Sequence, residues 1–143
     1  MKKIIELENT EDLKIAVKSL QSFLNPSKNI VLLNGDLGSG KTTFVVEYCS
    51  QYGLSASSPT FSVIQNYKNE KINIAHVDLY RLNDESEIDS VGFWDLFTAN
   101  YDVIFIEWSS KLNTKDLPLD WTIMNIDLQK ISETQRIMTI TKN

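Results

Sequence analysis

The chain has 143 residues, of which 42% are hydrophobic and 23% charged, as expected for one ordinary globular domain spanning residues 1–143. The formal net charge is −5, and no basic cluster of the kind that grips nucleic acid stands out. A single cysteine, Cys49, excludes a disulfide framework and indicates a reducing compartment. Because no apolar run approaches the roughly 20 residues that span a bilayer, we expect a cytoplasmic protein without membrane contact.

Strands and helices alternate along the first third of the chain. Residues 4–7 form a short predicted strand, and Thr10 is the expected N-cap of an amphipathic helix that ends at Pro26. The continuous apolar run at 30–33 is typical of a strand buried on both faces. Residues 42–52 then follow as a second helix, which Gly53 ends.

The rest of the chain is richer in strands. Residues 61–67 and 72–79 flank a polar turn and predict a hairpin. One or two short helices are expected within 84–100, a fully apolar strand at 103–106, and a final antiparallel pair at 121–128 and 136–141. These elements predict an α/β domain with a mixed sheet, in which antiparallel strands lie outside a parallel core.

The most specific motif lies between the strand at 30–33 and the following helix. Gly35, Asp36, Leu37, Gly38, Ser39, Gly40, Lys41 and Thr42 match the pattern G-x-x-x-x-G-K-[ST] at every fixed position. Glycines let successive backbone N–H groups turn toward phosphate oxygens, and the helix N-terminus faces the same anion. Lys41 can reach the outer phosphates, and the Thr42 hydroxyl can bind Mg²⁺. The motif therefore predicts a three-layer P-loop NTPase-like domain that binds ATP and Mg²⁺.

Two acidic residues follow strands next to this loop. Glu107 ends the apolar strand at 103–106, and ligands of open α/β sheets gather at the carboxyl ends of strands. Glu107 is thus placed to hold Mg²⁺, directly or through water, or to polarise the attacking water. The alternative is a glutamate on a solvated rim. Asp78 ends another predicted strand, while neighbouring His76 is open to a structural role and Arg81 to an ion pair or to transition-state stabilisation.

Two further segments bear on the site. Residues 58–61, Ser-Pro-Thr-Phe, lie where switch segments of P-loop proteins often place a hydroxyl near the terminal phosphate, and Thr60 is our candidate. Guanine-binding relatives use an Asn-Lys-x-Asp element. The most similar segment here, Asn-Thr-Lys-Asp at residues 113–116, has these residue types in a different order, so ATP is favoured over GTP.

The P-loop element 35–43, the segments 58–61 and 76–82, and Ile106-Glu107-Trp108 together resemble the TsaE (YjeE) family of bacterial ATPases. The resemblance covers nearly the whole chain. It implies a role in synthesis of threonylcarbamoyladenosine, a modified base next to the anticodon of certain tRNAs. It also implies action in a complex with TsaB and TsaD, whose ligase chemistry the protein sustains by ATP hydrolysis. Together with the acidic charge and the lack of an evident acceptor site, it favours hydrolysis that is slow without these partners and contact with tRNA only through the complex.

The same resemblance implies roles for individual residues. Thr42 and Glu107 would hold Mg²⁺, Asp78 and Thr60 would lie close to the reacting phosphate beside Lys41, and the P-loop would extend to Thr43. Thr10 and Arg136 would lie near the adenine. The chain departs from the family at Ser109-Ser110, where a residue such as proline is expected.

Two other functions stay open at this stage. A small-molecule kinase would share the P-loop, but such enzymes usually carry an arginine-bearing lid, and no arginine lies between Arg81 and Arg136. A nucleotide-binding subunit without catalytic activity, whose ATP only organises an assembly, is compatible with the composition.

Overall fold

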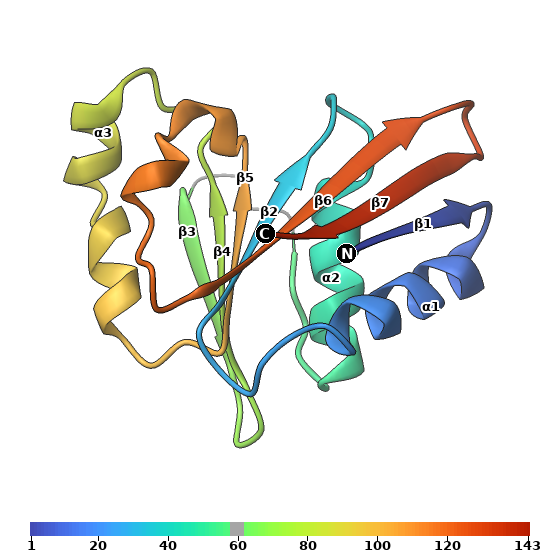
Figure 1. Ribbon diagram of the computed structural model, residues 1–143, viewed down its shortest axis with the longest axis horizontal. Coiled ribbons are helices and arrows are strands. Elements are labelled where there is room, and N and C mark those ends of the chain that lie inside the picture. The colour runs from blue at the N-terminus through green and yellow to red at the C-terminus, as the bar shows by residue number, and fades with distance from the viewer. Residues whose placement is uncertain (58–61) are drawn as a thin grey trace.

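The computed structural model describes residues 1–57 and 62–143 (Figure 1). Its centre is a seven-stranded sheet with the strand order β1-β7-β6-β2-β5-β4-β3. The strands are β1 (Lys2–Leu7), β2 (Asn29–Asn34), β3 (Ile64–Lys68), β4 (Asn73–Asp78), β5 (Val103–Glu107), β6 (Thr122–Lys130) and β7 (Arg136–Lys142).

The sheet has a parallel centre and antiparallel edges, as the sequence predicted. The four neighbours β6, β2, β5 and β4 run parallel to one another. β7 and β1 extend the sheet antiparallel on one side, and β3 pairs antiparallel with β4 on the other. Parallel strands end at the same edge, so Asn34, Asp78 and Glu107 come together there, with Asp78 directly opposite Glu107 in the register.

Helices cover both faces of the sheet and complete the three layers (Figure 1). The helices α1 (Thr10–Gln21) and α2 (Lys41–Gln51) pack on one face. On the other face lie α3 (Glu85–Ser90) and the 3₁₀ helix η1 (Phe93–Thr98). The short 3₁₀ turns η2 (Ser109–Lys111) and η3 (Thr114–Asp116), which follow β5 in the chain, lie on this face as well.

The central strands are buried on both sides because each contributes to two cores. In β2, Val31 and Leu33 pack with α1 and α2, whereas Ile30 and Leu32 pack with the residues of α3 and η1. This explains the uninterrupted apolar run, which is typical of strands covered by helices on both faces. Phe105 of β5 lies fully buried under α2.

The boundaries of α1 differ from the prediction. Thr10 is the first residue of the helix and not its N-cap, which is Asn9: the Asn9 carboxamide oxygen accepts a 2.9 Å hydrogen bond from the Asp12 N–H. Asparagine caps at least as well as threonine, and only position 9 has the extended backbone that a cap requires. The helix also ends at Gln21, ahead of Pro26, so the proline is not what ends it. Across the two described ranges, no helix is long and apolar enough to cross a membrane.

We expect the substitution Phe105→Ala to lower the free energy of unfolding by about 3–5 kcal/mol. The Phe105 ring packs edge-on against Tyr48 at 5.0 Å and Phe44 at 6.4 Å between ring centroids, so truncation leaves a cavity between β5 and α2. Urea denaturation measures the change. Leu119→Ala is the control, because Leu119 is fully exposed and its loss should cost less than about 0.5 kcal/mol. Equal stabilities of the two variants would contradict the packing of α2 on the sheet.

Candidate functional site

The loop between β2 and α2 contains three glycines with positive φ, Gly35, Gly38 and Gly40, and the first and last of them shape its two ends. Gly35 has φ 149°, and a Cβ atom there would lie 2.5 Å from both the Leu128 carbonyl oxygen and the Ser39 Oγ. A side chain would therefore clash with backbone of β6. Gly40, with φ 108°, is the N-cap of α2, so the loop leads directly into the positive end of that helix.

Lys41 points back into this loop. Its Nζ donates hydrogen bonds to the carbonyl oxygens of Gly35 at 2.5 Å and Asp36 at 3.1 Å, and lies 4.6 Å from the ring centroid of Trp108. Burial lowers the pKa of the Lys41 ammonium, and the nearby carboxylates of Glu107, Asp78 and Asp36 oppose that effect. The ammonium is thus a buried charge whose partners are weak neutral acceptors, and an anion in the loop would be a stronger one.

Glu107 is buried at the end of β5 and accepts two hydrogen bonds on the same oxygen. The Thr42 hydroxyl lies 3.0 Å from Glu107 Oε2, and His76 Nε2 lies 2.5 Å from that oxygen. Since Thr42 belongs to the first turn of α2 and His76 to β4, three elements converge on this carboxylate. The alternative of a glutamate on a solvated rim is wrong, because only 3% of Glu107 is exposed.

Asp78 is half-buried beside Glu107. Its Oδ1 accepts a 3.0 Å hydrogen bond from the Tyr80 N–H, which orients the turn after β4. The Tyr80 ring packs at a tilt of 43° against Trp108, with 5.0 Å between the ring centroids, and Lys111 Nζ donates to the Tyr80 carbonyl oxygen. The turn after β4 and the turn after β5 therefore contact and stabilise each other at the edge of the site.

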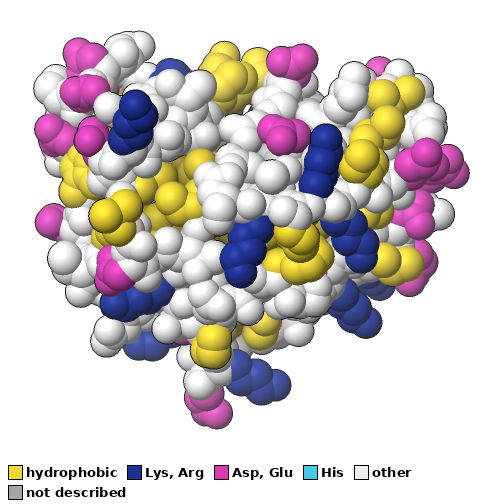
Figure 2. All heavy atoms as spheres, in the orientation of Figure 1, with side chains coloured by type: hydrophobic (Ala, Val, Ile, Leu, Met, Phe, Trp, Pro, Cys, Tyr) yellow, Lys and Arg dark blue, Asp and Glu magenta, His cyan; other side chains and the backbone are white. Residues whose placement is uncertain are grey.

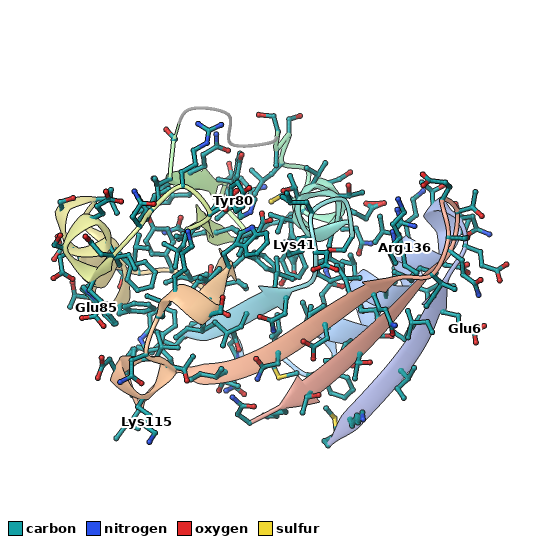
Figure 3. The ribbon with its side chains drawn as sticks, turned by 90° about the horizontal axis from the view of Figure 1, so that it is seen from above. Glu6, Lys41, Tyr80, Glu85, Lys115 and Arg136 are labelled. Carbon is teal, nitrogen blue, oxygen red and sulfur yellow. The ribbon has the colours of Figure 1, made fainter. Side chains whose placement is uncertain are left out.

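Arg136 joins the P-loop to the turn between β6 and β7. Its guanidinium donates to the carbonyl oxygens of Gly38 at 3.3 Å and Ser39 at 3.2 Å, and to Ser132 of the turn at 2.7 Å. This cation fixes the outer half of the loop. In Figure 3, Lys41 lies between Tyr80 on one side and Arg136 on the other.

A pocket of about 560 Å³ connects these groups. It runs from the P-loop to the start of α1 and the β6–β7 turn, and its lining includes Thr10, Asp78, Glu107 and Arg136. Thr42, Thr43 and the loop residues 37–41 also line it. The structure therefore brings together the described residues predicted for the site, except that Gly35 and Asp36 do not line the pocket. Thr60 lies outside the described residues, and Arg81 is exposed away from the pocket.

Sequence reasoning missed several contacts that build this site. Trp108 and Tyr80 belong to the motifs at 106–108 and 76–82, but no role was predicted for them. Their places next to the strand-end acids Glu107 and Asp78 were a usable signal. Ser109, the departure from the family pattern, is buried and its hydroxyl lies 3.2 Å from the Asn34 Oδ1. It links the turn after β5 to the end of β2, which a proline could not do through its side chain.

The oxygen atoms at the centre of the site suit a divalent cation with few protein ligands. Within residues 1–57 and 62–143, no group of three or more His, Cys, Asp and Glu side chains is arranged to hold a metal ion. Thr42 Oγ1 and Glu107 Oε2 supply two oxygens 3.0 Å apart. Mg²⁺ is usually held by one or two such protein ligands together with water and substrate phosphates, so these residues fit it.

Comparison with known proteins gives a consistent result. Residues 7–138 match the family described as "Threonylcarbamoyl adenosine biosynthesis protein TsaE". The chain is 38% identical over 141 residues to the TsaE protein of Rickettsia felis, covering 96% of this chain and 78% of the relative. It is 31% identical over 135 residues to the TsaE protein of Bacillus subtilis, covering 93% of this chain and 81% of that relative.

The fold agrees as well. The crystal structure of YdiB from Bacillus subtilis superposes with a TM-score of 0.72 at 25% sequence identity, over 99% of this chain and 86% of that one. The resemblance inferred from the P-loop and the strand-end motifs is confirmed by a family match that covers all of the described pocket residues. The chain belongs to the TsaE family of threonylcarbamoyladenosine biosynthesis proteins.

Proposed function

We propose that this protein is a Mg²⁺-dependent ATPase that acts with TsaB and TsaD in the threonylcarbamoyladenosine modification of tRNA. The observation that carries the proposal is the pairing of Thr42 with the buried carboxylate of Glu107 beside the P-loop. Membership of the TsaE family supplies the biosynthetic context, since the relatives are named as tRNA threonylcarbamoyladenosine biosynthesis proteins.

The phosphates of ATP would be held by backbone amides of the loop, by Lys41 and by the Ser39 hydroxyl. The amide N–H groups around Gly38 to Gly40 lie at the positive end of α2, which favours an anion. Lys41 would exchange its carbonyl partners for phosphate oxygens, because a charged acceptor makes a stronger hydrogen bond. The Ser39 hydroxyl is buried without a hydrogen-bond partner among the described residues, and a phosphate oxygen would satisfy it.

Hydrolysis would depend on two carboxylates at the edge of the sheet. Thr42 and Glu107 would hold Mg²⁺, which when bound neutralises charge on the transferred phosphoryl group. Asp78 lies next to Glu107 and lines the same pocket, so it is placed to orient water near the terminal phosphate. We retain Thr60 as a candidate for contact with that phosphate.

The nucleoside would lie in the outer part of the pocket. Thr10 at the start of α1 and Arg136 just after the β6–β7 turn flank that region, which also contains the apolar side chains of Leu7, Leu13 and Leu128. These surfaces would cover a purine ring without an element that reads guanine, which supports ATP over GTP.

The kinase alternative has less support. Arg136 is the only arginine among the described residues that line the pocket, and its guanidinium is committed to backbone carbonyl oxygens. A kinase lid would need a cation that is free to meet the transferred phosphate. A non-catalytic nucleotide-binding subunit would also use Glu107 to hold Mg²⁺, but it would not need a second carboxylate, that of Asp78, beside it in the same pocket.

We expect Lys41→Ala to weaken ATP binding about ten- to hundredfold, because a charge-assisted hydrogen bond contributes roughly 1.5–3 kcal/mol. Isothermal titration calorimetry of the folded variant measures the affinity. Lys14→Ala removes the same charge from an exposed site on α1 and is the control, which should bind like the parent. Unchanged affinity of Lys41→Ala would contradict the phosphate site.

The role in tRNA modification would be exerted through protein contacts. A net charge of −5 opposes encounter with a polyanion. On the face shown in Figure 2, lysine and arginine side chains are interspersed with acidic and uncharged ones and form no continuous basic surface. Partner contacts can also supply or order the groups that complete a catalytic site.

We expect hydrolysis of ATP by the isolated protein to be slow and to rise when TsaB and TsaD are added, as measured by phosphate release. A filter-binding titration should show weak, salt-sensitive or undetectable binding of tRNA by the isolated chain. Release that does not respond to TsaB and TsaD would refute the partner-dependent ATPase. Tight binding of tRNA to the isolated chain would instead refute the indirect route to tRNA.

A further inference from the structure

His76 is a buried polar side chain to which the proposed function gives no part. It is the only histidine of the chain, and 1% of it is exposed. Its Nε2 atom lies 2.5 Å from Glu107 Oε2. A polar ring in a core costs free energy unless it is hydrogen-bonded, so this contact is the main local reason that a histidine is tolerated there.

The register of the sheet creates the contact. His76 lies directly opposite Phe105, and Glu107 is two residues further along β5, on the same face of the sheet. Diagonal neighbours of this kind are within reach of long side chains. Because α2 covers the same face, Thr42 approaches Glu107 from above while His76 approaches it from the neighbouring strand.

The two donors meet at one oxygen. An ionised carboxylate only accepts hydrogen bonds, so the His76 Nε2 atom facing it carries the proton. The Thr42 hydroxyl donates to the same Oε2 atom. The Thr42 oxygen can bind a cation through a lone pair, whether or not its O–H still donates to Glu107, and in either case the histidine N–H is a donor that keeps the carboxylate in its orientation.

His76 can act only through Glu107. The described residues that line the pocket include Thr42 and Glu107 but not His76. Carboxylates that bind metal ions are commonly oriented by hydrogen bonds from a surrounding layer, and loss of such a partner typically costs about 10–100-fold in metal affinity or activity.

We propose that His76 is a positioning residue that sets the Glu107 carboxylate for a divalent cation on the nucleotide. This proposal rests on the proposed nucleotide and Mg²⁺ site. It adds a residue on a different strand whose contribution is felt only when the cation is present. Nucleotide affinity in the absence of Mg²⁺ is therefore independent of His76.

The test compares variants that differ in the reach of one N–H donor. His76→Gln places an amide nitrogen at about the position of Nε2, whereas His76→Asn is shorter and cannot reach Glu107. His76→Leu removes the donor and keeps a similar volume. Calorimetry with the non-hydrolysable β,γ-imido analogue of ATP, in Mg²⁺ and in EDTA, gives the Mg²⁺-dependent gain in affinity for each folded variant.

We expect the Mg²⁺-dependent gain in affinity to be about tenfold smaller in His76→Asn and His76→Leu than in the parent, and to be mostly kept in His76→Gln. Affinities in EDTA should stay within twofold of the parent. Added to Glu107→Gln, His76→Leu should cause no further loss, because residues that act as a unit are not additive. Ile74→Val, a buried change on the same strand and face, controls for lost stability and should retain the full gain.

Two outcomes would overturn the role of His76. One is an equal gain in the Gln and Asn variants, a comparison that holds even if the Leu variant does not fold. The other is a loss that adds fully to that of Glu107→Gln. Failure of the proposed nucleotide site looks different, because the unsubstituted protein would then show no Mg²⁺-dependent gain at all.

Discussion

The site depends on one buried carboxylate. An ionised side chain is costly in a protein interior unless hydrogen bonds replace the water that it loses. Glu107 meets this requirement through Thr42 and His76, which come from α2 and β4. The carboxylate can therefore be buried only when the P-loop helix is docked and when β4 and β5 are in register. The site and the central sheet therefore require the same arrangement, in which α2 is docked and β4 and β5 are in register.

The antiparallel edge of the sheet contributes to the site as well as to the fold. β6 supplies the Leu128 carbonyl that leaves no room for a side chain at Gly35, and Arg136 at the start of β7 holds the carbonyls of Gly38 and Ser39. The P-loop is thereby fixed from outside by strands that follow it by about ninety residues. The contact of the Tyr80 ring with Trp108 joins the turns after β4 and β5. The loop and both carboxylates are thus held by rigid elements, as a preorganised charge-binding site requires.

Much of this could be predicted from local patterns in the sequence. The glycine pattern of the P-loop predicts its backbone conformation without any distant contact. The apolar runs of β2 and β5 predict two buried strands and place Glu107 at the end of the second. The start of α1 was misassigned because Asn9 and Thr10 are both good caps and only the backbone conformation separates them. The contact of His76 with Glu107 depends on the pairing of β4 with β5, and the role of Ser109 depends on the distance to Asn34. Neither relation is local in the sequence, so neither could be derived from spacing.

Glu107 is the residue on which hydrolysis is predicted to depend most, so its role is not only that of a structural acid. The most direct measurement is phosphate release by Glu107→Gln in the presence of TsaB and TsaD, at saturating ATP and Mg²⁺. The amide keeps the shape of the side chain but removes its charge. We expect the variant to bind nucleotide and its rate to fall by about 10²-fold or more. Hydrolysis at the rate of the parent protein would contradict the role of Glu107 at the Mg²⁺ site.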